Sequence, residues 1–168
     1  GANLSYVDLS EHDLTGTNLS GVNLSHAKFS STNLKGKDLS GANLSYVDLS
    51  EHDLTGTNLL GVNLSHAKLS NVSIKGKDLS GVNLSFVDLS EHDLTGTNLS
   101  NSILTETNLS GIDLTSGPLT NADFRYANLS ESKLPDSVLV NNNFDYAELN
   151  GINFMEKICQ DLHSHRSV

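Results

Sequence analysis

The sequence predicts a solenoid in which the chain turns a corner every five residues and buries one large apolar side chain per unit. Three observations predict it. Every fifth residue from Leu4 to Phe154 is Leu, Phe or Ile, without exception over 31 positions. The residue before each is Asn or Asp in 23 cases, and the residue after it is Ser or Thr in 22. Of the 13 Gly, 12 share one phase of the repeat, two places after the central apolar residue.

A period of five fits neither a helix nor a strand. Five residues advance about 500° around an α-helix, so the Leu positions would spiral instead of forming one face. In a straight strand, alternation would place successive Leu on opposite sides. A corner in each unit removes the conflict, since Gly two places after Leu suits the positive φ of a type II turn. Asn and Asp suit such corners because their side chains bond nearby backbone.

The units GANLS, GVNLS, NADFR and YANLS resemble those of the pentapeptide-repeat family, and the resemblance covers residues 1 to about 154. It implies an all-β fold: a right-handed, four-sided parallel β-helix (a solenoid) with four pentapeptides per coil, hence about eight coils. The central residue and the residue two before it then line the interior. The family is mostly non-catalytic and functionally mixed. The inward central positions include Leu4, Leu9, Leu14, Leu19, Leu24, Phe29, Leu44, Leu64, Phe124, Phe144 and Phe154.

The end of the chain has a different pattern. Met155, Ile158, Cys159 and Leu162 stand at i, i+3, i+4 and i+7, the spacing of a helical stripe. We therefore expect a β-helix over residues 1–154 and a short amphipathic capping α-helix and tail over 155–168, since solenoid ends need caps. No cap precedes Gly1, which predicts a segment of a larger protein.

A second period of 40 lies on top of the first. Residues 1–40 and 41–80 are identical at 34 positions, so two coil types of 20 residues alternate. One outward column then alternates in charge and predicts a ladder of solvated ion pairs between coils, each worth a few tenths of a kcal/mol to about 1 kcal/mol. This ladder is Asp8, Lys28, Asp48, Lys68 and Asp88.

Large polar residues break the inward pattern. His12, His52 and His92, and likewise Lys37 and Lys77, occupy positions two before the central residue, where small residues fit. A buried unpaired Lys is costly, so we expect these side chains to reach out to solvent or to distort the corner.

One outward column is aromatic. Exposed rings stacked along a rigid rod predict a candidate protein-contact strip, and the alternative is a stack that only shields the backbone. The strip is Tyr6, His26, Tyr46, His66, Phe86, Tyr126 and Tyr146, and Glu106 occupies the same column between Phe86 and Tyr126.

Composition and motifs exclude several classes. One Cys excludes a disulfide framework and any Cys-rich zinc module, and Cys159, His163 and His165 are too few to hold zinc on a terminal segment. There is no membrane-span run and no signal peptide in the chain. No Ser-His-Asp set, P-loop or dinucleotide loop is present, so we expect no enzyme activity, catalytic residue, cofactor or metal. The net charge of −10 disfavours direct binding of nucleic acid or anionic membranes.

The leading functional prediction is a non-enzymatic rigid scaffold or protein-interaction module with a protein partner of unknown identity. It is expected within a larger bacterial protein, cytoplasmic or secreted into a host cell as an effector. A homodimer, or end-to-end contact through an uncapped coil, is a further expectation. The alternative is a DNA mimic that inhibits or protects a type II topoisomerase, although Lys in every second coil interrupts the acids. A minor alternative is an ice-binding solenoid, from Thr-Gly-Thr triplets such as Thr15-Gly16-Thr17.

Overall fold

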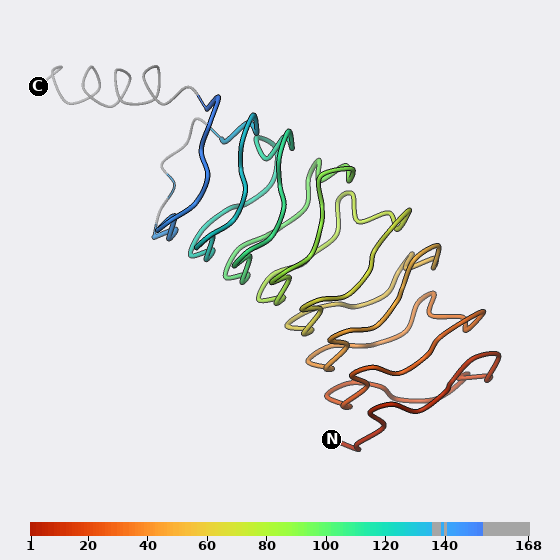
Figure 1. Cartoon of the computed structure of the whole chain (residues 1–168). Coiled ribbons are helices and arrows are strands. Elements are labelled where there is room, and N and C mark those ends of the chain that lie inside the picture. The colour runs from red at the N-terminus through yellow and green to blue at the C-terminus, as the bar shows by residue number, and fades with distance from the viewer. Residues whose placement is uncertain (136–138, 140, 153–168) are drawn as a thin grey trace, which may run out of the picture.

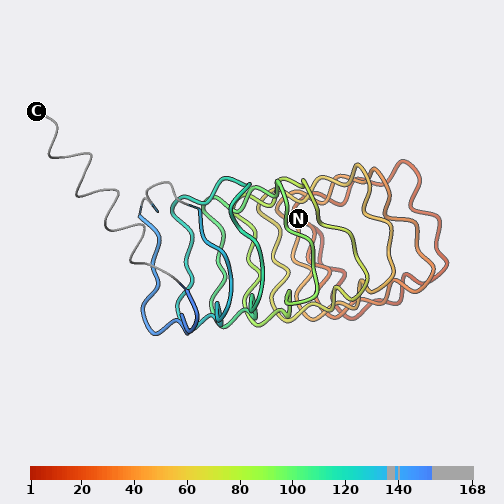
Figure 2. The same cartoon turned by 90° about the horizontal axis from the view of Figure 1, so that it is seen from above.

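The chain forms a rod of stacked coils that advances steadily from its N-terminus to residue 152 (Figures 1 and 2). The computed structural model describes residues 1–135, 139 and 141–152. Within these residues there is no helix and no strand longer than an isolated bridge, so no element has bounds to give. Every bridge is parallel and joins residues 20 apart, as Asn3 and Asn23 do. The predicted parallel β-helix with four five-residue units per coil is confirmed, whereas Phe154 and the predicted helix over 155–168 lie outside the described residues.

The corners that follow the central residues from Leu4 to Leu109 are hydrogen-bonded turns. The Leu14 carbonyl accepts from the Thr17 amide at 3.0 Å, and Gly16 between them has φ 73°, the geometry of a type II turn. The same left-handed position holds non-glycine residues at other corners, for example Tyr6 at φ 63°. The residue before Leu locks the turn from outside, since Asp13 Oδ1 accepts the Thr15 amide at 2.8 Å. The Asn or Asp before Leu and the Gly after it are therefore explained by the hydrogen bonding and the positive φ of the turn.

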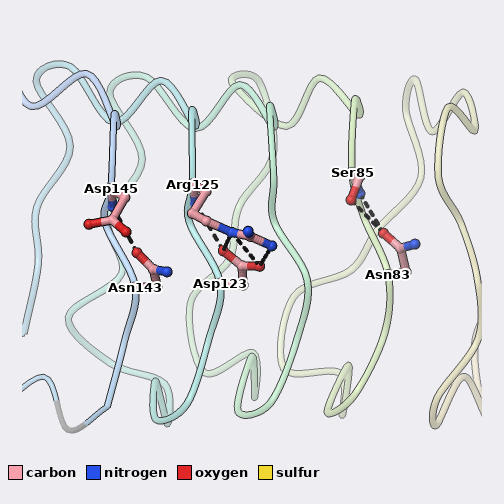
Figure 3. A network of polar contacts seen from close by, with 6 residues as sticks. All are labelled: Asn83, Ser85, Asp123, Arg125, Asn143 and Asp145. Carbon is pink, nitrogen blue, oxygen red and sulfur yellow. Dashed lines mark hydrogen bonds and ion pairs between the residues drawn. The ribbon is translucent and has the colours of Figure 1, made fainter.

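Figure 3 shows the same side-chain hydrogen bond on several coils of one side. Asn83 Oδ1 accepts from both the amide and the hydroxyl of Ser85, at 3.0 and 2.7 Å. Two coils further on, Asp123 accepts the Arg125 amide at 3.1 Å and pairs with its guanidinium, the shortest distance being 2.7 Å. A change of residue type at this position thus preserves the local bond.

The core is a continuous column of the central residues. Leu24 and Leu44 are fully buried, and Phe124 stacks on Phe144 with ring centroids 5.0 Å apart. Leu4 in the first coil and Phe144 in the last described coil are half-buried. Burying one such side chain contributes about 1.5–3 kcal/mol, so the column is the main source of stability. The other listed inward residues are buried: Leu9, Leu14, Leu19, Phe29 and Leu64.

Neighbouring coils are not bridged equally on all four sides. The side that carries Asn3 is bridged between every pair of adjacent coils as far as Asn143. The two sides that flank it are bridged in alternate interfaces over residues 1–100. The bridges are Asp8–Lys28 and Asp48–Lys68 on one side, and Asp38–Asn58 and Asp78–Asn98 on the other. Each interface is therefore closed on one of these two sides and open on the other, and the open side changes from one interface to the next.

The inward His side chains fill one set of openings. His52 Nε2 lies 2.9 Å from the Phe29 carbonyl oxygen, and His92 Nε2 lies 2.9 Å from that of Leu69. Both acceptors are 23 residues earlier, in the preceding coil. The expectation that these rings would reach solvent is met only in part, because both are half-buried with a backbone carbonyl within reach. Only His12, in the first coil, is exposed.

The inward Lys side chains fill the openings on the other side. Lys37 Nζ donates to the Leu14 carbonyl at 2.5 Å, and Lys77 Nζ donates to that of Leu54 at 2.6 Å. Both residues are half-buried, so the expected outward path is met only in part for them too. Their length spans the open interface, and the carbonyl replaces part of the hydration of the ammonium group.

Short hydroxyl side chains make the same bond where the interface is closed. Thr57 Oγ1 donates to the Leu34 carbonyl at 2.9 Å, in an interface that the Asp38–Asn58 bridge closes. Thr32, on the other side, donates to Leu9 at 2.7 Å. The 40-residue period therefore matches side-chain length to the alternation of closed and open interfaces.

Candidate protein-contact surface

Five aromatic and imidazole rings form one stack along a corner of the rod. Their ring centroids are 4.3–4.5 Å apart and their planes lie within 4–8° of parallel. Each of these residues is the third residue of the first turn of its coil. Its φ is near 60°, as in Tyr46 at 62°, and this directs the side chain away from the core. We call this set the aromatic column: Tyr6, His26, Tyr46, His66 and Phe86.

The stack hides ring faces and exposes ring edges. Each inner ring has a neighbour on both of its faces, so a nucleobase or sugar has no free face to stack on there. The Tyr and Phe rings remain well exposed nonetheless, at 72% for Tyr6, 52% for Tyr46 and 47% for Phe86, whereas His26 and His66 are half-buried. The column therefore presents ring edges, together with the phenol hydroxyls of Tyr and the ring nitrogens of His.

The remaining residues of the predicted strip form a separate pair. Tyr126 stacks on Tyr146 with centroids 4.9 Å apart, and both are exposed. Glu106 occupies the corner between Phe86 and Tyr126, so the structure does not bring all seven rings into one stack.

The charge ladder beside the aromatic column is paired in twos. Lys28 Nζ lies 4.0 Å from Asp8, and Lys68 Nζ lies 3.6 Å from Asp48. Both lysine side chains are more than 70% exposed. Asp88 instead accepts a hydrogen bond from the side-chain amide of Asn108 at 3.0 Å. The ladder thus departs from the continuous alternation expected from sequence, because only alternate interfaces are closed on this side.

A second surface feature is a pair of polar grooves at the interfaces that open beside His52 and His92. One groove, of about 580 Å³, lies between residues 30–34 and 50–53. The other, of about 330 Å³, lies between residues 70–74 and 90–93. The lining includes Asp48, Glu51 and Asp53 in the first groove and the equivalent acids in the second.

One acid of each groove is paired with a lysine. Lys35 Nζ lies 3.2 Å from Asp53, and Lys75 Nζ lies 2.7 Å from Asp93. The hydroxyl and the amide of Thr55, followed by Lys35, lower the pKa of Asp53 to about 2. Lys75 and then Thr95 lower the pKa of Asp93. These acids are thus held ionised and partly neutralised by lysine.

The Thr-Gly-Thr triplets do not form a surface array. Thr57 and Thr97 are buried, with 9% and 2% of their surfaces exposed, and each donates its hydroxyl to a carbonyl of the preceding coil. Thr15 and its equivalents remain outside, together with Thr17 of the first coil alone, so the regular paired Thr surface needed for ice binding is missing from this corner.

Two surface features of functional interest were not predicted from the sequence. One is the set of ring edges, because stacking geometry depends on side-chain torsions in neighbouring coils. The other is the open grooves. Their signal is the alternation of His or Lys with Thr or Val at inward positions, which marks long side chains in every second coil.

The described residues 1–135, 139 and 141–152 contain no group of three or more His, Cys, Asp or Glu arranged to hold a metal ion. Cys159, His163 and His165 lie outside them. No helix in this part of the chain is long and apolar enough to span a membrane.

The comparisons with known proteins identify one family. The sequence model for pentapeptide repeats matches in 8 copies, over residues 1–36, 38–76, 78–115 and 119–156. This match is consistent with the right-handed winding expected from the repeat units. No curated protein sequence matches the chain.

Solved structures of pentapeptide repeat proteins also align with it. HetL, a pentapeptide repeat protein involved in heterocyst differentiation regulation in the cyanobacterium Nostoc sp. strain PCC 7120, is 28% identical over 89% of this chain and 75% of its own, with a TM-score of 0.43. Trypsin-treated QnrB1, a plasmid-mediated fluoroquinolone resistance protein, is 18% identical over 96% and 83%, with a TM-score of 0.40. A pentapeptide repeat protein of the Arabidopsis thaliana thylakoid lumen is 24% identical over 72% and 67%, with a TM-score of 0.32.

Proposed function

Because the chain belongs to the pentapeptide-repeat family, we propose that it is a non-enzymatic, rigid protein-interaction module whose contact surface is the aromatic column. Such a module acts by presenting a fixed surface to a protein partner.

The observation that carries this proposal is the exposure of stacked rings on a rod whose interior is already filled. Tyr6, Tyr46 and Phe86 are 47–72% exposed, although Leu, Val and Ala fill the core. Aromatic residues are enriched in the centres of protein interfaces, and contiguous exposed apolar surface on a soluble protein marks interaction sites.

Rigidity supports the same proposal. Every ring is anchored on a hydrogen-bonded corner, and the Tyr46 amide donates to the Ser65 carbonyl of the next coil at 3.0 Å. Stacking on both faces restricts each ring further. A surface ordered before binding loses little conformational entropy on association, which favours affinity.

The test is a triple substitution, Tyr6→Ser, Tyr46→Ser and Phe86→Ser, with capture of partner proteins from a bacterial lysate as the readout. We expect capture to be lost while the melting temperature stays within a few degrees of that of the unsubstituted chain. The matched control is Leu60→Ser, which removes a 50% exposed apolar side chain from another corner and should leave capture intact. Unchanged capture by the triple variant would exclude the aromatic column as the contact surface.

The net charge of −10 favours a second candidate, mimicry of duplex DNA at a type II topoisomerase. The ion pairs of Lys35 and Lys75 reduce the negative charge of the most acidic side, which weighs against it. A DNA supercoiling assay with micromolar protein decides this: inhibition or protection supports mimicry, and no effect rejects it.

A further inference from the structure

We infer that the aromatic column binds a second copy of this chain, laid antiparallel along the same corner, with its first four rings and the charged column beside them as the interface. This inference rests on the proposed function, because it names the partner of the same surface.

Spacing restricts what can meet every ring. The rings of the column recur every 4.3–4.5 Å. A single extended peptide advances 3.2–3.4 Å per residue and falls out of step, whereas stacked chains of β-structure repeat at about 4.7–4.9 Å. A partner that contacts each ring edge therefore carries its own stack of coils, and a second copy of this chain has the same spacing.

Alternation along the column makes it self-complementary in one arrangement. A twofold axis perpendicular to the two rods places Tyr6 opposite His66 of the other copy and His26 opposite its Tyr46. Each phenol hydroxyl then faces an imidazole, which offers a donor or an acceptor in either tautomer. A twofold interface must bury the same patch on both copies, and this four-ring patch satisfies that requirement.

The charged column is complementary in the same arrangement. Asp8 of one copy faces Lys68 of the other, and Lys28 faces Asp48. A shift by one ring would place acid against acid and Tyr against Tyr, which costs electrostatic energy and selects the register. A shift by two rings would use Asp88, which already accepts from Asn108.

These charges are available for pairing between copies. The side chains of Lys28 and Lys68 are 72% and 73% exposed, and those of Asp8 and Asp48 are 59% and 57% exposed. Their ion pairs within one copy are long, at 4.0 and 3.6 Å. The patch is a narrow strip along one corner of four coils, whereas a standard interface buries about 800 Å² per partner, so we expect the dimer to be weak and concentration-dependent.

The experiment exchanges charges in two arms and measures mass by sedimentation equilibrium from micromolar to millimolar protein. The acidic arm is Lys28→Asp with Lys68→Asp, and the basic arm is Asp8→Lys with Asp48→Lys. We expect each arm alone to dimerise at least tenfold more weakly than the unsubstituted chain. An equimolar mixture of the two arms should recover a 1:1 dimer, because acid then faces lysine along the whole column.

The matched control is Lys35→Asp with Lys75→Asp, which makes the same change in net charge on another side of the rod. It should dimerise within about threefold of the unsubstituted chain at 0.15 M salt, where distant charges are screened. Circular dichroism at each concentration verifies that all variants are folded.

Three results would overturn the inference: an unsubstituted chain that stays monomeric at millimolar concentration, an acidic arm that dimerises as well as the unsubstituted chain, or arms that fail to recover when mixed. A monomeric chain that still captures a foreign protein through Tyr6, Tyr46 and Phe86 leaves the proposed function standing and rejects this partner. A dimer that persists in the triple Ser variant rejects the aromatic column for both.

Discussion

His52 Nε2 lies 2.9 Å from the carbonyl oxygen of Phe29, which belongs to the preceding coil. The ring lies in an interface that has no bridge between Lys28 and Asp48, within the part of the chain that the structure describes. The imidazole thus supplies a bond between two coils on a side where the backbones do not pair.

The His52 contact predicts an asymmetry between two residues of identical local sequence. His52→Ala leaves a gap and deprives a half-buried carbonyl of its second donor, so the free energy of unfolding should fall by about 1–3 kcal/mol. His12→Ala is the control, because His12 is exposed and contacts only the Ser10 carbonyl, at 2.9 Å. It should cost less than about 0.5 kcal/mol. Urea denaturation measures both, and equal losses would contradict the role assigned to His52.

Lys77 should tolerate loss of its charge better than loss of its length. Burial lowers the pKa of Lys77, with Asp53 opposing the shift, so the folded chain disfavours the charged form relative to the unfolded chain. Lys77→Met keeps the side-chain volume and removes the ionised group, so its unfolding free energy should stay within about 1 kcal/mol of the original. Lys77→Ala empties the open interface and should cost about 1–3 kcal/mol. The idea fails if Met is as damaging as Ala in the same urea titration.

Leu64 and Leu60 are four residues apart and test which positions of the repeat point inward. Leu64 is 1% exposed and occupies a central position, whereas Leu60 is 50% exposed. Leu64→Ala should destabilise by about 2–5 kcal/mol, because the stacked core cannot collapse around the cavity. Leu60→Ala should change stability by no more than about 0.5 kcal/mol. Thermal melts give the order, and similar losses for the two variants would refute the inward assignment.

Asp53 predicts how stability depends on pH. Its folded pKa is about 2, below the ordinary value of 3.8 for Asp, so the ionised form stabilises the fold. The sign follows directly: this contribution is complete above about pH 4 and is lost as the pH falls toward 2. The urea midpoint should therefore decrease over that window. Asp53→Asn keeps an Oδ1 acceptor for Thr55 without the titration, as Asn58 does for Leu60 at 3.1 Å.

The other Asp residues with lowered pKa values limit the expected size of that change. Asp13 also has a lowered pKa, through the Thr15 hydroxyl and amide, so Asp53→Asn should flatten the acid limb only in part. An acid limb identical to that of the unsubstituted chain would show that Asp53 does not contribute.

Most of the fold could be predicted from the sequence, because its information is local. The turn from Leu14 to Thr17 needs only Gly16 at its third position and Asp13 in front, and these four residues are neighbours in the chain. The candidate surface was predictable as a column of residues 20 apart. The edge-on presentation of its rings was not, since the torsions of Tyr46 depend on the His26 and His66 rings above and below it.

By itself the sequence determined the five-residue corner, the inward Leu column and the alternation of two coil types, because each follows from short-range geometry repeated many times. Only the tertiary structure decided which interfaces open on which side and what fills them. The bonds from His52 to Phe29 and from Lys77 to Leu54 span 23 residues, and they form because stacked coils bring those groups together. A periodic sequence specifies that neighbours stack, whereas the side on which an interface stays unbridged depends on packing and hydrogen bonding summed over the whole interface.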